Sequence, residues 1–182
     1  MSVITKRARL LRLAILNILQ EGPVHGYAVR KHLNSSLGTF KTLSYGSLYP
    51  ALRKLETEGV IASSEERSED SIRKRVVYSI TEKGSNYLSD ELSTVQPKDW
   101  EDENFSVRFQ LFSETDILSR VQILEGRYNS LQKRIESMKS WADIASKKSD
   151  PYVQELAKHT LQQAKNEVEW LSGLLVKEKS NL

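Results

Sequence analysis

The chain of 182 residues contains no cysteine, only eight glycines and only four prolines. Without cysteine there are no disulfides, no thiolate zinc sites and no thiol nucleophile. The shortage of glycine and proline argues against a loop-rich all-β fold. No hydrophobic run reaches the ~18 residues of a membrane-spanning helix, and the N-terminus lacks the apolar run of a signal peptide. We therefore expect a soluble, cytoplasmic protein.

Groups that commonly carry catalysis are also scarce. The three histidines, His25, His32 and His159, are scattered, and none has the spacing of a metal-ligand motif. The sequence contains no nucleophile elbow, no zinc-protease motif, no phosphate-binding glycine loop and no dinucleotide fingerprint. We expect no catalytic residue, no metal and no cofactor, and hence a protein that is not an enzyme.

Charge is distributed unevenly along the chain. Lysine and arginine number 27 against 24 aspartates and glutamates, a net charge of +3. The acidic stretch Gln96–Asn104 holds a proline, four carboxylates and no aliphatic side chain, so we expect it to be exposed and to separate two domains. Residues 1–95 then carry a net charge of +4 and residues 96–182 a net charge of −1.

Residues 1–95 show the pattern of three helices, two strands and a fourth helix. Leu48, Leu52 and Leu55 have the spacing of one buried helical stripe, and Gly59 ends that helix. The extended segment from Val60 and the alternating segment up to Ile80 form a pair of strands around a polar turn. The prediction is a mainly α fold with a small two-stranded wing, a winged helix-turn-helix DNA-binding domain.

Residues 96–182 show two helices of about 25–30 residues with heptad spacing, typical of a helical hairpin or coiled coil. Ser113–Asp116 fits a capping box for the first of them, and Asp150 with Pro151 fits the start of the second. Aromatic residues add more apolar surface than one hairpin covers, which favours a homodimer. The predicted dimerisation residues are Ile117, Val121, Leu124, Tyr128, Leu131, Ile135, Val168, Leu171 and Leu175.

The second helix of a helix-turn-helix enters the major groove of DNA, and helix N-termini and cationic side chains contact phosphates. Lys6, Arg7, Arg9 and Arg12 are placed to reach a flanking phosphate. Tyr45 and Tyr49 are equally explained as packing residues. The predicted DNA-binding residues are Tyr27, Lys31, Ser44, Tyr45, Ser47, Tyr49, Arg53, Lys54, Arg67, Arg73, Lys74 and Arg75.

Three segments of this pattern carry a family resemblance. They are HGY at 25–27, SYGSLYPALRKLETEG at 44–59 and YSITEKG at 78–84, and together they closely resemble the PadR family of bacterial transcriptional regulators. The second half resembles the virulence-activator-type helical domain that accompanies it, through residues 102–105, 150–152 and 169–171. The resemblance implies a winged-helix dimer, usually a repressor, and some members respond to phenolic acids.

Regulation by a small aromatic effector is a further hypothesis from the sequence. Trp100, Trp141 and Trp170 are candidates for lining its site, although packing in an interface explains each of them more simply. The main alternative from another class is a coiled-coil adaptor whose winged domain binds protein rather than double-stranded DNA. The basic wing and the polar start of the second helix of the helix-turn-helix favour DNA.

Overall fold

The computed structural model describes residues 6–36, 45–66, 75–145 and 150–182. The chain forms two compact units, of which the first comprises residues 1–94 and 106–115 and the second comprises residues 95–105 and 116–182. The predicted domain boundary before residue 96 lies one residue after the point, between residues 94 and 95, at which the chain first passes from the first unit to the second. After residue 105 the chain returns to the first unit, where Val107 and Leu111 join the hydrophobic core, and no sequence pattern predicts this return.

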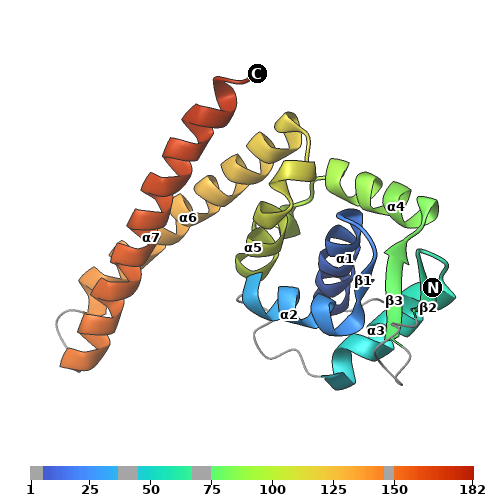
Figure 1. The fold of residues 1–182 in the computed structure, drawn as a ribbon. Coiled ribbons are helices and arrows are strands. Elements are labelled where there is room, and N and C mark those ends of the chain that lie inside the picture. The colour runs from blue at the N-terminus through green and yellow to red at the C-terminus, as the bar shows by residue number, and fades with distance from the viewer. Residues whose placement is uncertain (1–5, 37–44, 67–74, 146–149) are drawn as a thin grey trace. The chain divides into compact units, whose positions relative to one another are not determined.

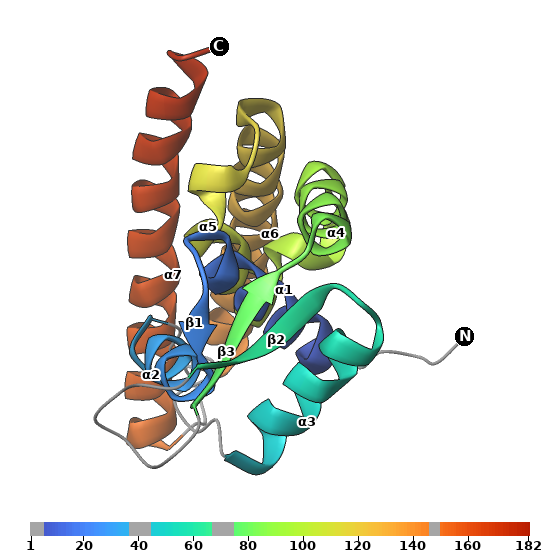
Figure 2. The same ribbon diagram turned by 45° about the vertical axis from the view of Figure 1, so that its right-hand side comes forward.

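The first unit is mainly helical with a small antiparallel sheet, as predicted (Figures 1 and 2). The sheet has three strands in the order β1-β3-β2, because two residues at Val24 and His25 pair with the far side of β3. A two-residue strand has no detectable alternation in the sequence. The elements are α1 (Lys6–Gln20), β1 (Val24–His25), α2 (Gly26–Ser36), α3 (Tyr45–Thr57), β2 (Ile61–Glu66), β3 (Arg75–Ile80) and α4 (Glu82–Ser93).

Helix α1 lies at the centre of the first unit and is buried around much of its circumference. Leu13, Ile15 and Leu16 are fully buried, as expected of a helix whose apolar residues cover several faces. The stripe of Leu48 and Leu52 on α3 packs into the same core.

A glycine turn fixes where α3 ends and the wing begins. Gly59 has φ +71°, the left-handed conformation that glycine adopts without steric cost. Its N–H donates to the Glu56 carbonyl at 2.8 Å, and the N–H of Val60 donates to the Leu55 carbonyl at 3.1 Å, which is a Schellman motif. The predicted end of this helix at Gly59 is confirmed.

The TEKG segment, residues 81–84, attaches the start of α4 to that turn. The Thr81 hydroxyl donates to the Gly59 carbonyl at 2.8 Å and accepts from the N–H of Gly84 at 3.1 Å. Lys83 Nζ donates to the Glu58 carbonyl at 2.7 Å. A Cβ on Gly84 would lie 2.0 Å from the Val60 carbonyl oxygen, so only glycine permits this approach.

The second unit contains the predicted pair of long helices. α6 and α7 are 29 residues each and lie side by side in opposite directions, joined by ion pairs such as that of Arg120 with Glu178 at 3.2 Å. Asp150 caps α7 by accepting from the N–H of Tyr152 at 2.7 Å, as predicted. The elements after α4 are η2 (Pro97–Trp100), α5 (Asp102–Gln110), η3 (Phe112–Glu114), α6 (Ile117–Ala145) and α7 (Pro151–Lys179).

Two local predictions for this region are wrong. Asp116, rather than Ser113, lies at the start of α6 and accepts from the N–H of Ser119 at 2.9 Å, because a 3-10 turn occupies residues 112–114. The acidic stretch 96–104 is not simply exposed: Asp99 and Asn104 are buried. Asp99 accepts from the N–H of Gln96 at 2.8 Å, so its carboxylate caps its own turn. None of the described helices is long and apolar enough to cross a membrane.

Candidate nucleic-acid interface

Helix α3 presents a polar face opposite its buried stripe. Ser47, Pro50 and Lys54 are exposed and follow one another at spacings of three and four residues, which places them on one side of the helix. Arg53 is exposed beside them. These side chains project from the helix that a winged helix-turn-helix inserts into the major groove.

Tyr49 has a packing role at the junction of α3 with α2 and β3. It is half-buried, and its ring and hydroxyl would lie 3.3 Å from a Cβ on Gly26, the glycine of the HGY segment. The Tyr78 ring would lie 3.2 Å from the same Cβ. Burial raises the pKa of Tyr78, and the nearby carboxylate of Glu56 raises it further. Gly26 therefore lets α2 start directly against the two tyrosines that join α3 to the wing.

Helix α2 adds a second polar surface. Tyr27 is 63% exposed, and Lys31, one turn further along, is also exposed. With Arg30, Asn34 and Ser35 they line a shallow depression of about 360 Å³. Two cationic side chains and several hydrogen-bond donors on one helical face suit a phosphate backbone.

The wing consists of β2 and β3, paired from Ile61 opposite Ile80 to Glu66 opposite Arg75. The Ser63 hydroxyl on β2 donates to the Glu56 carboxylate, which ties the wing to α3. Arg75 is exposed at the end of the described wing. Of the remaining predicted DNA-binding residues, only the backbone of Tyr45 is described, and the following lie outside the described residues: Ser44, Arg67, Arg73 and Lys74.

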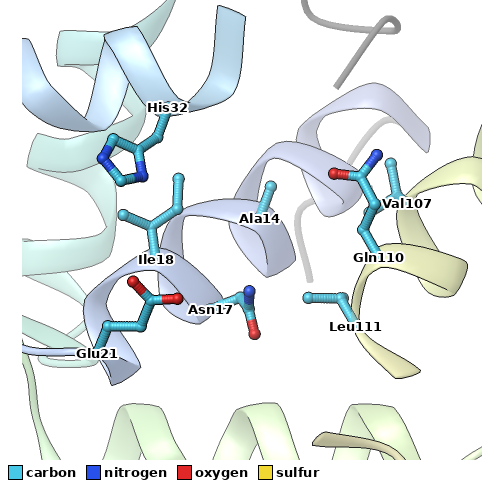
Figure 3. Close-up of a pocket in the computed structure, with 8 residues that line it drawn as sticks. All are labelled: Ala14, Asn17, Ile18, Glu21, His32, Val107, Gln110 and Leu111. Atoms are coloured by element: carbon cyan, nitrogen blue, oxygen red, sulfur yellow. The ribbon is translucent and has the colours of Figure 1, made fainter. Parts of the chain in front are cut away.

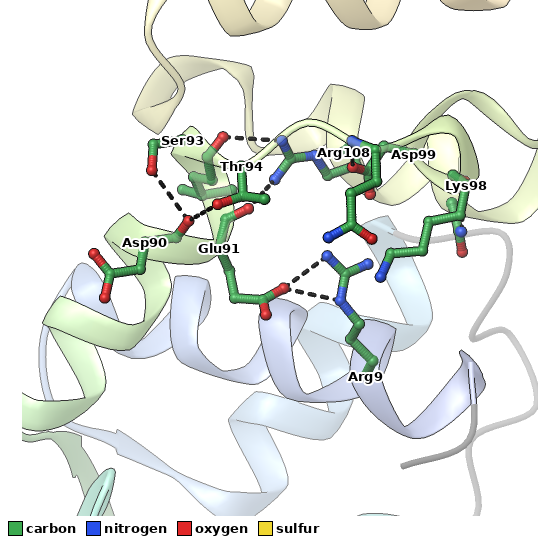
Figure 4. A network of polar contacts seen from close by, with 11 residues as sticks. Arg9, Asp90, Glu91, Ser93, Thr94, Lys98, Asp99 and Arg108 are labelled. Atoms are coloured by element: carbon green, nitrogen blue, oxygen red, sulfur yellow. Dashed lines mark hydrogen bonds and ion pairs between the residues drawn. The ribbon is translucent and has the colours of Figure 1, made fainter. Parts of the chain in front are cut away.

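Arg9 and Arg12 form ion pairs within the protein. This corrects the expectation that they are available to contact a flanking DNA phosphate. Arg9 Nε donates to Glu91 Oε2 at 2.8 Å (Figure 4), and Arg12 pairs with the Glu58 carboxylate. The Arg12 guanidinium also lies 4.0 Å from the centroid of the Tyr87 ring. Both arginines stabilise the packing of α1 instead.

Arg108 is a buried structural side chain that no local sequence pattern reveals. It is fully buried and donates to the carbonyls of Glu91 and Leu92, both at 2.9 Å, at the C-terminal end of α4 (Figure 4). Those carbonyls have no partner within their own helix, so the guanidinium satisfies them and fixes the end of α5 to the first unit.

The predicted dimerisation residues form the inner seam of the hairpin in the second unit. Val121, Leu124, Leu131, Ile135 and Leu171 are buried within the single chain, and the side chains of the other four, Ile117, Tyr128, Val168 and Leu175, are half-buried. The exposed large apolar side chains of α6 and α7 are different residues, namely Leu118, Tyr152, Val153, Leu156, Trp170 and Val176.

The candidate effector tryptophans are packing residues where their side chains are described. The Trp100 ring lies against the backbone of Gly126, where a Cβ would approach it to 2.3 Å. Trp170 is 45% exposed and meets the Phe105 ring edge-on, with centroids 6.3 Å apart. The Trp141 side chain is outside the described part of the structure.

A cavity in the first unit was not foreseen from the sequence. It has a volume of about 230 Å³ and lies between α1, α2 and the segment 107–111 (Figure 3). Its walls combine apolar side chains with polar groups from three separate stretches of the sequence, so no single motif marks it. The lining residues are Ala14, Asn17, Ile18, Glu21, His32, Val107, Gln110 and Leu111.

Comparison with known proteins supports the resemblance. Residues 15–90 match the family model of the transcriptional regulator PadR-like family. The negative transcriptional regulator PadR of Bacillus subtilis (strain 168) is 27% identical over 176 residues, which cover 92% of this chain and 96% of that protein.

Solved structures with detectable similarity include B. subtilis PadR in complex with operator DNA. It is 24% identical, has a TM-score of 0.46 and is aligned over 93% of this chain and 99% of that chain. The structure of B. subtilis PadR in complex with p-coumaric acid is 21% identical, with a TM-score of 0.44, over 96% and 98% of the two chains. The chain is thus similar to PadR-like transcriptional regulators, through the family model over residues 15–90 and through a relative aligned along nearly its whole length.

Proposed function

We propose that the protein is a homodimeric repressor that binds an inverted-repeat operator in double-stranded DNA through α3, α2 and the wing. The observation that carries this proposal is the polar, partly cationic surface of α2 and α3, formed by exposed Tyr27, Lys31, Ser47, Arg53 and Lys54. Such side chains contact phosphates and base edges, whereas the opposite face of α3 is buried in the core. The match of residues 15–90 to a family of transcriptional regulators likewise favours DNA binding over catalysis.

The second unit supplies the dimer in this proposal. The inner seam of the hairpin is already buried, so we assign self-association to its exposed apolar side chains. Leu156 is 65% exposed and Val176 is 70% exposed on α7, and Leu118 is 69% exposed on α6. We propose that these side chains of the two helices meet a second copy of the chain, because exposed apolar surface often marks an association site. We place the assembled regulator in the cytoplasm.

We propose that a small aromatic effector binds in the cavity of the first unit, whose lining also contains the carboxylate of Glu21. Its volume of about 230 Å³ is small for a ligand site, which suits a ligand of one ring. His32 and Asn17 offer hydrogen-bond donors, and Ile18, Val107 and Leu111 offer apolar walls (Figure 3). The structure of B. subtilis PadR with p-coumaric acid makes that compound the first probe for this chain.

The function is tested by selecting bound fragments from a pool of random DNA duplexes. We expect an inverted repeat and two chains per duplex, because a symmetric dimer presents two equivalent α3 helices. Recovery of no shared sequence, or a stoichiometry of one chain per site, would contradict the proposal.

The effector site is tested with Gln110→Trp, which places a larger side chain at the cavity wall. Gln110 is exposed, so we expect the variant to fold and to keep operator affinity while losing release by p-coumaric acid. The matched control is Gln122→Trp on an exposed position of α6 outside the lining. Equal responses of both variants to the compound would show that it does not act through this cavity.

A further inference from the structure

One buried arginine in the second unit joins three segments of the chain. Arg127 on α6 is 8% exposed, and its Nε donates to Glu167 Oε1 on α7 at 2.7 Å. Its Nη1 donates to Asp102 Oδ1 at 2.6 Å and to the Trp100 carbonyl at 3.2 Å. The guanidinium therefore connects the hairpin to η2 and to the first residue of α5.

Apolar packing adds to this connection. The Arg127 guanidinium lies 5.3 Å from the centroid of the Phe105 ring, and Trp170 of α7 meets the same ring edge-on at an interplanar angle of 87°. The Trp100 ring covers Gly126, where any side chain would collide with it. The segment 100–105 is thus held on the hairpin by packing as well as by hydrogen bonds.

Only arginine can make all the hydrogen bonds that Arg127 makes at this position. Its planar guanidinium has five N–H donors, so it serves two carboxylates and a carbonyl at once, whereas a lysine ammonium is a compact point charge. Burial lowers the pKa of Arg127, but the hydrogen bonds and charges of Glu167 and Asp102 outweigh burial and raise it overall. The guanidinium is therefore charged at neutral pH.

Helix α5 belongs to both compact units. Its residues 102–105 lie in the second unit, and its residues 106–110 lie in the first. The later part carries Val107 and Gln110 of the cavity wall, and Arg108 fixes it to the end of α4. One continuous helix therefore begins at the Arg127 connection and ends at the cavity.

We propose that Arg127 is a positioning residue that fixes the start of α5 to the hairpin, so that occupancy of the cavity is transmitted along α5 to the dimerising unit. The proposal rests on the effector function proposed above. A ligand shifts an equilibrium only by its differential affinity for two states. When the hydrogen bonds of Arg127 are lost, the cavity still binds its ligand, but a change in the position of α5 no longer changes the position of the α6–α7 hairpin.

The first test needs no ligand. Hydrogen exchange of the amides of residues 105 and 106, the first that donate within the start of α5, is compared in the full-length dimer for wild type, Arg127→Gln and Arg134→Gln. Arg134 is the matched control, because it lies on the same helix, is 53% exposed and has its Nη1 3.9 Å from Asp102 Oδ2. We expect exchange at least about tenfold faster in Arg127→Gln and unchanged exchange in Arg134→Gln, since local opening tracks local contacts.

Arg127→Gln is expected to fold. The side chains of Glu167 and Asp102 are 29% and 69% exposed, so water hydrates both carboxylates when the arginine is absent. Dimer mass and the unfolding midpoint verify this. Arg127→Lys keeps the charge with fewer donors and should give an intermediate exchange rate. If Arg127→Gln and Arg134→Gln exchange alike at residues 105 and 106, the proposal that Arg127 fixes the start of α5 is overturned.

The second test measures transmission with p-coumaric acid as the probe. Operator affinity is determined with and without the compound, and coupling between allosteric sites is commonly about 5- to 150-fold. We expect Arg127→Gln to bind the compound and the free operator like wild type, within about twofold, while the coupling factor falls to near 1. Undiminished coupling in Arg127→Gln overturns transmission through α5. If the operator affinity of the wild type does not change with p-coumaric acid, the proposed effector is wrong. The exchange experiment still tests whether Arg127 fixes the start of α5 to the hairpin.

Discussion

Single glycines decide how closely segments of this protein approach one another. Gly84 faces the Val60 carbonyl oxygen, Gly26 faces two tyrosine rings, and Gly126 faces the Trp100 ring. Two of the three lie within segments on which the family resemblance rests. Gly26 of HGY and Gly84 of TEKG therefore serve packing beside α3, whereas the exposed Tyr27 of HGY belongs to the surface proposed to contact DNA.

Gly84→Ala tests this account at the residue scale. The added Cβ would lie 2.0 Å from a backbone oxygen that cannot rotate away, so we expect the free energy of unfolding to fall by at least about 2 kcal/mol. Chemical denaturation measures it.

Gly173→Ala on α7 is the matched control. A Cβ added at Gly173 would meet nothing within 4 Å in the chain, so we expect a gain of about 0.5–1 kcal/mol from helix propensity. A loss at Gly173 equal to that at Gly84 would show that helix position, and not the approach to Val60, sets the effect.

At the scale of elements, helix boundaries depend on which polar side chain takes the cap. The sequence predicts the winged helix-turn-helix and both long helices, because their periodicities are strong over many residues. It does not predict that Asp116 starts α6, since Ser113 satisfies the same motif equally well. The ion pairs of Arg9 and Arg12 and the buried Arg108 depend on residues far apart in the sequence, such as Glu91, and no local pattern reveals them.

Asp116 gives a prediction with a definite sign in pH. Hydrogen bonds from the Ser119 side chain and backbone lower the pKa of Asp116 from its usual value of 3.8. A depressed pKa contributes stability above the unfolded value, and this contribution is lost as the pH falls through the folded value. We expect Asp116→Ala to cost about 0.5–2 kcal/mol at neutral pH, with a difference from wild type that shrinks below about pH 4.

Asp116→Asn separates the charge from the cap. It keeps an oxygen that accepts from Ser119, so it should retain most of the stability at neutral pH and lose the pH dependence that arises at this position. Unfolding free energies at several pH values measure both variants. A difference between wild type and Asp116→Ala that is constant from pH 3 to pH 7 would contradict the assignment.

At the scale of the whole molecule, the proposed function requires two copies of the surface formed by α2, α3 and the wing. The net charge of +3 is small for one chain, but α2 and α3 together carry +3 and a dimer would present that charge twice. The wing, residues 61–80, holds four cations and four carboxylates. We expect the two half-sites of the operator to lie about one helical turn apart, roughly 10 base pairs. Insertion of 5 base pairs between them places the half-sites on opposite faces of the duplex and should abolish dimer binding in a mobility-shift assay. Tolerance of that insertion would indicate independent binding of single winged domains.

The salt dependence of operator affinity in Arg53→Ala/Lys54→Ala tests the central claim, DNA binding through α3, most directly. The matched control is Lys133→Ala/Arg134→Ala, an adjacent exposed pair of cations on α6. Each lost phosphate contact should lower the slope of log affinity against log salt by about 1. We predict weaker binding and a shallower slope for the α3 variant, and wild-type behaviour for the α6 control. Wild-type affinity and slope in the α3 variant would contradict the account.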